Sequence, residues 1–155
     1  MNTPATFKHK PEILAPAGDM EAALAAFAAG ADAVYLGLKH FSARMQAENF
    51  SLTDLASLAE LARAENRKIY IALNTVLKSD DLAPAGRLMA RLARDVKPHA
   101  LIIQDIGAVE LARQAGFAGE LHLSTLANVT HPAALAEAAR LCSIRVILPR
   151  ELTID

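Results

Sequence analysis

The chain has 155 residues, of which 53% are hydrophobic, and its formal net charge is −1. This length is typical of one domain, and the hydrophobic content is enough to form a core. The small net charge excludes a global basic field that would attract nucleic acid, but it does not exclude a local basic patch. The single cysteine, Cys142, excludes an internal disulfide and cannot bind a metal ion alone.

The first residues are not typical of a targeting segment. The sequence MNTPATFKHKPE contains basic residues but no apolar core follows them, so it does not predict a signal peptide. No apolar run approaches the roughly 18 residues of a membrane span. We expect residues 1–10 to form a flexible tail and residues 11–155 to form the domain, and the lone cysteine suits a cytoplasmic location.

Short apolar runs bounded by turn residues alternate with helical patterns along the chain. The first run covers residues 12–16, and Asp19 is placed to cap a helix over 19–29 that stops at Gly30. A second apolar run, residues 33–37, is too short for a helix. Two such strands joined by one helix form a parallel βαβ unit, which is right-handed in nearly all proteins.

The same unit repeats through the rest of the chain. Ser51 and Asp54 have the spacing of a capping box, which predicts the start of the second helix. Further strands are predicted over 68–73, 100–103, 121–124 and 144–148. The helices are predicted over 51–65, from Asp80 or Asp81 to near Pro98, from Asp105 to Gly116, and from Thr130 or His131 onward.

Strict alternation of six strands with five helices indicates a parallel sheet with helical crossovers. A flavodoxin-like doubly wound sheet is complete near this length, whereas a (β/α)₈ barrel needs eight units and about 250 residues. The turn from Pro16 to Asp19 has one glycine and does not match the dinucleotide fingerprint GxGxxG. We therefore favour an α/β fold of the TIM-barrel type, truncated to about six βα units, with consecutive strands and helices on the outer face only.

Polar residues follow the predicted strands, and in a parallel barrel all these strand ends meet at the rim that carries active sites. Arg44 lies in a connection, 38–50, that is longer than folding requires. Arg150 and Glu151 follow a buried strand, where an ion pair is costly unless it is used or hydrogen-bonded. The predicted substrate-binding residues are Arg44, Asn74, Gln104, Ser124, Asn128, Arg150 and Glu151. No catalytic residue is identified.

Several polar residues have a structural alternative. Asp19 and Asp105 are well placed as helix caps. Tyr70 fits a core position, and His122 is interpreted as a structural histidine rather than a ligand or base. Ser124 is also suited to satisfying turn amides, because a nucleophile needs a nearby base and none is evident. The histidines show no metal-binding spacing, and no Ser/His/Asp order or HExxH motif appears.

An ordered set of short motifs resembles the amino-terminal part of the collagenase-like peptidases of unassigned catalytic type, family U32. The motifs are LAPAGD (14–19), AGADAVYLG (29–37), FSAR (41–44), NFS (49–51), LNT (73–75), IIQDIG (102–107), HLSTLANVT (122–130) and ILPREL (147–152). The likeness covers almost the whole chain beyond the first ten residues. One departure is Leu126, where the family often has glutamine, which puts a polar contact there in doubt.

The resemblance implies the barrel portion of a larger enzyme. Some relatives were named peptidases, and others look like iron–sulfur proteins that support hydroxylation of RNA bases or of ubiquinone precursors. Their cluster ligands are cysteines in a part of the family that this sequence lacks. We therefore expect no cofactor in this chain, a possible iron–sulfur cluster in the missing carboxyl-terminal part, and RNA, peptide or a small molecule as substrate. The alternative is a binding or assembly module without catalysis.

A truncated barrel also predicts a partner. Six strands of an eight-stranded barrel leave two open edges, and unpaired edges recruit other chains. Bare apolar surface of more than a few hundred Å² is rare on stable monomers. We therefore expect a homodimer through the open edges, since a two-fold arrangement is the commonest closed one.

Overall fold

The computed structural model describes residues 10–38, 41–42, 50–141 and 144–152. Within these ranges, six parallel strands form one sheet in the order β1-β2-β3-β4-β5-β6. The strands are β1 (Leu14–Pro16), β2 (Ala33–Gly37), β3 (Lys68–Leu73), β4 (Ala100–Ile103), β5 (Glu120–Leu123) and β6 (Ile144–Val146). The helices α1 (Met20–Ala28), α2 (Leu52–Ala64), α3 (Leu82–Arg91), α4 (Gly107–Gln114) and α5 (Pro132–Leu141) connect them.

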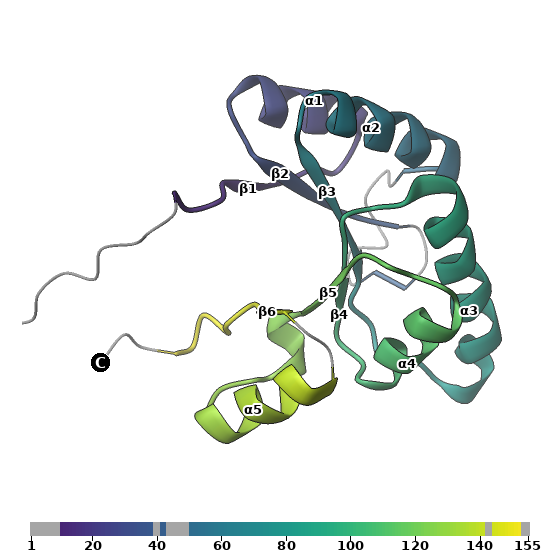
Figure 1. Cartoon of the computed structure of the whole chain (residues 1–155), viewed down its shortest axis with the longest axis vertical. Helices are drawn as coiled ribbons and strands as arrows, with labels where there is room; N and C mark the ends of the chain where they lie inside the picture. The colour runs from purple at the N-terminus through teal and green to yellow at the C-terminus, as the bar shows by residue number, and fades with distance from the viewer. Residues whose placement is uncertain (1–9, 39–40, 43–49, 142–143, 153–155) are drawn as a thin grey trace, which may run out of the picture.

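The sheet curls into a half-barrel with the helices outside it (Figure 1). This arrangement confirms the truncated TIM-barrel-like fold and contradicts the flavodoxin-like alternative, in which helices cover both faces. The predicted strand boundaries agree within two residues. The predicted tail, 1–10, falls outside the described residues except for its last position. Within the described ranges, every helix is too short or too polar to cross a bilayer.

Local sequence signals explain where the first two helices begin and end. The Asp19 carboxylate accepts a hydrogen bond from the Ala22 amide at 2.8 Å, so Asp19 is the predicted cap of α1. The chain leaves α1 through Gly30, whose φ of 98° is a conformation that glycine adopts without strain. Ser51 and Asp54 form the predicted capping box at the start of α2.

The third helix differs from its prediction. Instead of one helix from Asp80 or Asp81 to Pro98, a 3₁₀ turn at Ser79–Asp81 precedes α3, and a π-helical segment at Leu92–Val96 follows it. Lys97 has a left-handed backbone conformation that ends the segment, and Pro98 follows without an amide to continue it. A sequence pattern of period 3.6 does not distinguish these helix types.

Asp105 lies two residues before α4, and its carboxylate caps the first amide of the helix. The helix begins at Gly107, after Ile106, whose side chain makes no capping hydrogen bond. The Asp105 carboxylate instead accepts from the Gly107 amide at 2.8 Å and from the Leu77 amide at 3.0 Å. Asp105 therefore fixes the loop after β3 to the loop after β4, on the carboxyl-terminal rim of the sheet.

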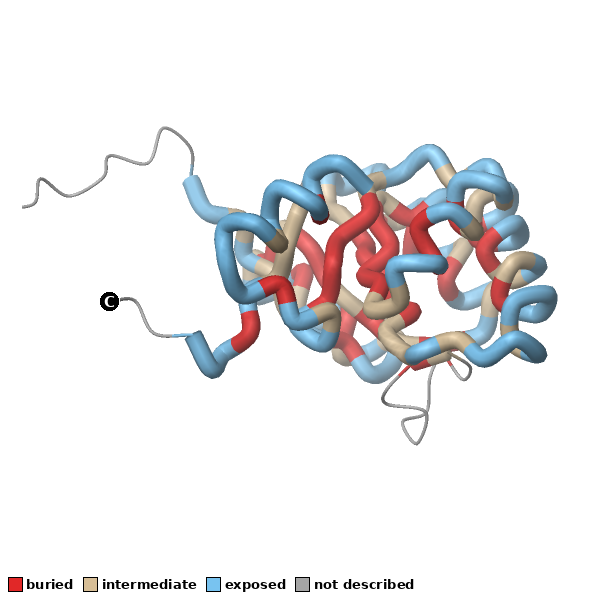
Figure 2. Tube along the Cα trace, turned by 90° about the horizontal axis from the view of Figure 1, so that it is seen from below, coloured by how far each residue is buried: buried red, intermediate tan, exposed pale blue. Residues whose placement is uncertain are grey.

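The two faces of the sheet bury different residues. The outer face of β3, Ile69, Ile71 and Leu73, packs in the large core beneath the helices. The inner face, Tyr70 and Ala72, belongs to a second cluster inside the half-barrel. Figure 2 shows buried chain concentrated in the middle of the molecule and exposed chain around it. On α1, Ala23 and Phe27 are buried, whereas Leu24 is exposed.

Candidate functional site

A cavity of about 370 Å³ lies inside the half-barrel, toward the carboxyl ends of the strands. Its walls come from the inner faces of all six strands or the residues just after them. The lining residues are Leu14, Pro16, Ala17, Gly18, Tyr35, Leu36, Gly37, Ser42, Ala72, Asn74, Ile102, Ser124, Thr125 and Ile147. We call this cavity the lumen pocket. Its place on the fold is where barrel enzymes carry their active sites.

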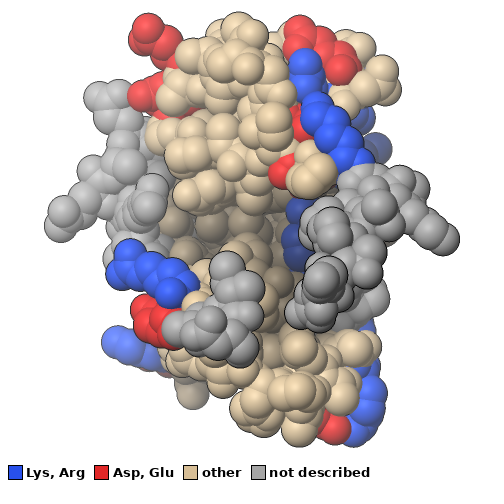
Figure 3. All heavy atoms as spheres, turned by 90° about the vertical axis from the view of Figure 1, so that its left-hand side faces the viewer, with Lys and Arg blue, Asp and Glu red and all other residues tan. Residues whose placement is uncertain are grey.

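The lumen pocket has no charged side chain among its described lining residues. Apolar groups, including Tyr35, Ile102 and Ile147, form most of the wall, and the hydroxyls and amide of Ser42, Asn74, Ser124 and Thr125 supply polarity. Figure 3 faces the open side of the half-barrel and shows a central hollow among mostly uncharged residues, with Lys and Arg side chains at its margin. Such a pocket favours a neutral ligand with an apolar face and a few hydrogen-bonding groups.

Two of the predicted site residues line the lumen pocket. Asn74 follows β3, and the buried Ser124 follows β5. Ser124 also has the structural role that the sequence suggested, because its hydroxyl accepts from the Leu126 amide at 3.2 Å and caps a short 3₁₀ helix, Thr125–Ala127. That geometry leaves the Ser124 hydroxyl proton available for donation to a ligand.

The other predicted residues that the structure describes lie elsewhere. Gln104 is half-buried after β4 but is not a lining residue. Asn128 is exposed and ends the 3₁₀ helix with a left-handed φ of 53°, a conformation that asparagine tolerates. The Arg150 and Glu151 side chains are 95% and 75% exposed and 3.7 Å apart, so the argument from a buried ion pair does not apply to them. Arg44 lies outside the described residues.

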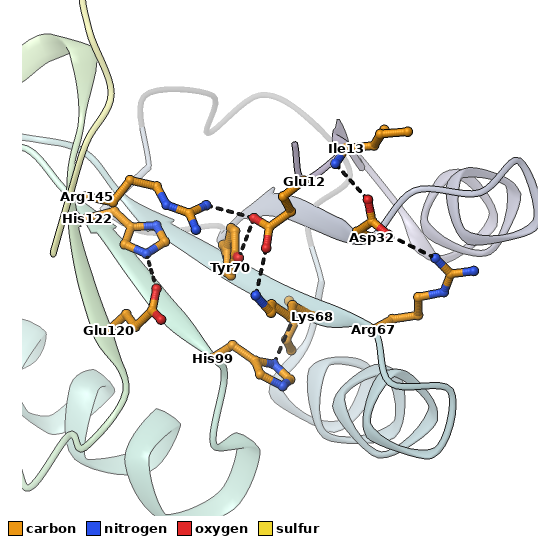
Figure 4. A network of polar contacts seen from close by, with 11 residues as sticks. Glu12, Ile13, Asp32, Arg67, Lys68, Tyr70, His99, Glu120, His122 and Arg145 are labelled. Carbon is orange, nitrogen blue, oxygen red and sulfur yellow. Dashed lines mark hydrogen bonds and ion pairs between the residues drawn. The ribbon is translucent and has the colours of Figure 1, made fainter. Parts of the chain in front are cut away.

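Below the lumen pocket, at the amino-terminal end of the half-barrel, lies a cluster of polar side chains that we call the floor. The Glu12 carboxylate is its centre (Figure 4). Glu12 Oε2 accepts from Lys68 Nζ, and Glu12 Oε1 accepts from the Tyr70 hydroxyl and from Arg145 Nη1, each at 2.7 Å. The Arg145 guanidinium lies 5.5 Å from the centre of the Tyr70 ring. The floor therefore links the segment before β1 to β3 and β6.

His122 completes the floor. Its Nε2 lies 2.7 Å from Glu120 Oε2, and its ring packs edge-on against Tyr70 with the centroids 4.9 Å apart. Both rings are buried, which agrees with the predictions of a core tyrosine and a structural histidine. Burial lowers the pKa of His122, although the hydrogen bond to Glu120 opposes this. The imidazole is accordingly neutral at pH 7.

Charge interactions on the floor shift the pKa of Glu12 strongly. Burial by itself would raise the pKa, but the hydrogen bonds from Lys68, Tyr70 and Arg145 and the charge of Arg145 outweigh it and lower the pKa from 4.5 to about 2. Burial raises the pKa of Tyr70, and its hydrogen bond to the Glu12 carboxylate raises it further. Glu12 is therefore an ionised carboxylate and Tyr70 a neutral donor at neutral pH.

Sequence reasoning missed the floor. The sequence analysis places Glu12, Lys68 and Arg145 within the predicted strands 12–16, 68–73 and 144–148 and assigns them no contact with one another. The available signal was the period of two along each strand, which places Glu12 on the face of Leu14 and Arg145 on the face of Ile147. Charged residues on a face that is otherwise apolar indicate partners inside the barrel.

Comparison with known proteins decides the family. The model of peptidase family U32 matches residues 18–155, which is most of the chain. The chain belongs to peptidase family U32. The fold agrees, because the solved structure of the U32 peptidase Mk0906 superimposes with a TM-score of 0.70 at 10% identity, over 96% of this chain and 62% of that one.

The U32 relatives have two kinds of name. A collagenase from Porphyromonas gingivalis is 37% identical over 93% of this chain and 34% of its own length. The 23S rRNA 5-hydroxycytidine C2501 synthase of Escherichia coli is 40% identical over 95% of this chain and 22% of its own length. The tRNA hydroxylation protein P of Escherichia coli is 34% identical over 94% of this chain and 32% of its own length. The chain thus spans about a third or less of each of these relatives.

The residues of this chain do not fit an iron–sulfur cluster. Such clusters are held mainly by four cysteine thiolates, and this sequence has one cysteine. Within the described ranges, no group of three or more His, Cys, Asp or Glu side chains is placed to bind a metal ion.

Proposed function

We propose that this U32 chain is the substrate-holding barrel of a protein that supports the hydroxylation of RNA bases, and that the lumen pocket holds the base. The observation that carries the proposal is the uncharged lining of the pocket. A nucleobase is neutral and planar, whereas a peptide chain or a phosphate would bring charges or many backbone groups that the lining does not match. Relatives named for rRNA and tRNA hydroxylation support the same reading.

The size and chemistry of the lumen pocket fit an extruded base. Enzymes that act on bases take them out of the stack into a close pocket, with apolar or aromatic side chains against the ring and hydrogen bonds to its edge. The 370 Å³ cavity has Tyr35, Ile102 and Ile147 as apolar walls. The Asn74 amide carries both donor and acceptor groups, as does the edge of a pyrimidine.

Peptide hydrolysis is less well supported. A serine nucleophile needs an adjacent general base. Ser42 and Ser124 are buried serines of the lumen pocket, and the histidine on the strand before Ser124, His122, contacts Glu120 on the floor instead.

The remaining parts of the proposal concern what surrounds the barrel. We assign any iron–sulfur cluster to residues that this sequence does not include, and we place the protein in the cytoplasm with its RNA substrate. We also propose a homodimer through the open edges, since β1 and β6 each pair with one strand in the described part of the chain. Light scattering at micromolar concentration tests the dimer, and a sharp monomer mass would contradict it.

Filling the lumen pocket tests its role. Ala72 lines the pocket, so Ala72→Leu should obstruct the base and lower the hydroxylated nucleoside content of rRNA and tRNA at least about tenfold in cells that depend on the variant. The control is Ala64→Leu, the same change at an exposed position of α2, which should keep full activity. Mass spectrometry of digested RNA is the measurement.

Three results would overturn the proposal. Equal hydroxylation by both variants would remove the lumen pocket from the reaction. Cleavage of collagen or casein by the purified protein, together with normal RNA modification in cells that lack it, would favour the peptidase reading. Tight RNA binding with no effect on hydroxylation would favour a binding module.

A further inference from the structure

The floor and the lumen pocket are consecutive layers of the same strands. Successive inward side chains of a strand are two residues apart. Glu12 is followed by Leu14, Tyr70 by Ala72, and Arg145 by Ile147, and in each pair the second residue lines the pocket. Any displacement of the floor residues relative to one another must therefore move the pocket walls by a similar amount.

The strands with the fewest hydrogen-bonded neighbours are those at the two edges of the sheet, β1 and β6. In the described part of the chain, β1 pairs with β2 alone and β6 pairs with β5 alone, so the half-barrel is open between them (Figure 1). A closed barrel holds every strand by hydrogen bonds on both sides. Here the described contact that crosses the opening is the 2.7 Å ion pair between Glu12 and Arg145.

The centre of this contact is rigid. Tyr70 is fully buried, donates to the Glu12 carboxylate and lies under the Arg145 guanidinium. The Glu12 side chain is 19% exposed and the Arg145 side chain 37%, so water screens their attraction only partly. A charge-assisted hydrogen bond with a fixed third partner restricts geometry more than an exposed surface pair does.

We propose that Glu12 and Arg145 are positioning residues: their contact, which we call the clamp, holds the first and last strands at a fixed separation and so sets the width of the lumen pocket. The inference rests on the proposed function only for the identity of the ligand. The width itself can be measured without RNA.

The separation of the outer strands is measured by pulsed electron paramagnetic resonance. Spin labels are placed at two exposed positions, Ile13 just before β1 and Leu148 just after β6. The single native cysteine is removed by Cys142→Ser. Arg145→Met keeps an apolar stem against Tyr70 and leaves Glu12 with its other two donors. This variant should give a longer mean distance and a broader distribution.

The width of the pocket is measured by thiol labelling. A thiol introduced by Ala72→Cys in the Cys142→Ser background lies in the pocket wall, where a bulky maleimide enters slowly. Adding Arg145→Met should raise its labelling rate at least about tenfold, the factor that corresponds to about 1.4 kcal/mol. Arg145→Lys keeps the charge and should restore most of the slow rate. Glu137→Gln, which removes an exposed pairing with Arg140, is the matched control and should change neither readout.

A second variant controls for misfolding. Glu12→Gln leaves Arg145 in place and neutralises its partner, and it should move both readouts in the same direction as Arg145→Met. Circular dichroism verifies that each variant is folded before labelling. Unchanged distances and labelling rates in two folded variants would overturn the proposal, and so would longer distances with an unchanged labelling rate.

Titration of the same proteins with cytidine, followed by NMR, separates this inference from the proposed function. If the wild-type chain binds cytidine, the clamp variants should bind at least about tenfold more weakly. Failure of the wild-type chain to bind cytidine would count against the proposed function. The distance and labelling results would still show whether the contact between Glu12 and Arg145 sets the width of the lumen pocket. Normal cytidine affinity in a variant with a widened pocket would overturn the clamp's role in ligand binding and leave the function standing.

Discussion

Replacing Glu12 by glutamine removes one negative charge from the floor and keeps the shape of the side chain. The pKa of Glu12 is 4.5 without the protein environment and about 2 in the folded chain. Each tenfold change in proton affinity corresponds to about 1.4 kcal/mol, so the ionised carboxylate contributes about 3 kcal/mol to the free energy of unfolding at pH 7. We expect Glu12→Gln to lose most of this amount.

The loss should depend on pH in one direction. Because folding lowers the pKa of Glu12, its contribution is fully present above the unfolded value of 4.5 and disappears as the pH falls toward about 2. Glutamine resembles the protonated carboxyl, so the stability difference between the two proteins should shrink over that range. The groups that surround position 12, including Lys68, Tyr70 and Arg145, are the same in both proteins, so the comparison isolates Glu12.

Urea unfolding followed by circular dichroism, at pH values from about 7 to about 2.5, measures the difference. With slopes of about 1–3 kcal/mol/M for small proteins, the midpoint should fall by about 1–3 M at pH 7. Glu137→Gln is the control, since its exposed ion pair should be worth less than about 1 kcal/mol. A difference that stays constant down to the lowest pH would refute the reasoning, because it would come from packing rather than charge.

Three further predictions test the floor and the backbone. Tyr70→Phe removes one donor to Glu12 and should cost about 1–3 kcal/mol in urea unfolding, with a loss below about 0.5 kcal/mol contradicting a role for the hydroxyl. Gly119→Ala should lower the free energy of unfolding by about 1–3 kcal/mol, because the added Cβ would lie 2.8 Å from the His99 carbonyl oxygen and 2.9 Å from that of Pro98. The control, Gly18→Ala, adds a Cβ with nothing within 4 Å and should be nearly neutral. Equal melting temperatures for the two variants would contradict this prediction. Ser51→Ala breaks the capping box of α2 and should cost about 1 kcal/mol by thermal unfolding, and an unchanged melting temperature would show that the cap is dispensable.

Much of the fold could be predicted because its signals are local. Ser51 and Asp54 identify a helix start by their own spacing, and the alternation over 68–73 assigns Ile69 and Tyr70 to opposite faces, as the structure confirms. Strict strand and helix alternation then limits the sheet to a few topologies. The third helix was less predictable, because the change to π-helical geometry at Leu92–Val96 leaves the hydrophobic spacing almost unaltered.

The candidate site was predictable only in part. Asn74 and Ser124 were found because each follows a strand at a position that faces the lumen. Asn128 satisfied the same rule of following a strand, but its left-handed turn is a local backbone requirement that the rule does not consider. The floor was missed because Glu12 and Arg145 are 133 positions apart, and a contact at such separation has no signature in either neighbourhood.

The order of the strands has a consequence for how the chain folds. Each strand pairs with the one made just before it, as Leu14 with Ala33 and Tyr70 with Ala100, so the growing chain can add one βα unit at a time as it leaves the ribosome. Every step closes a short loop at a modest entropic cost. The hydrogen bond from Arg145 to Glu12 is different, because it can form only when the sixth strand has docked. We therefore expect that contact to form after the transition state, so weakening it should speed unfolding and leave the folding rate almost unchanged.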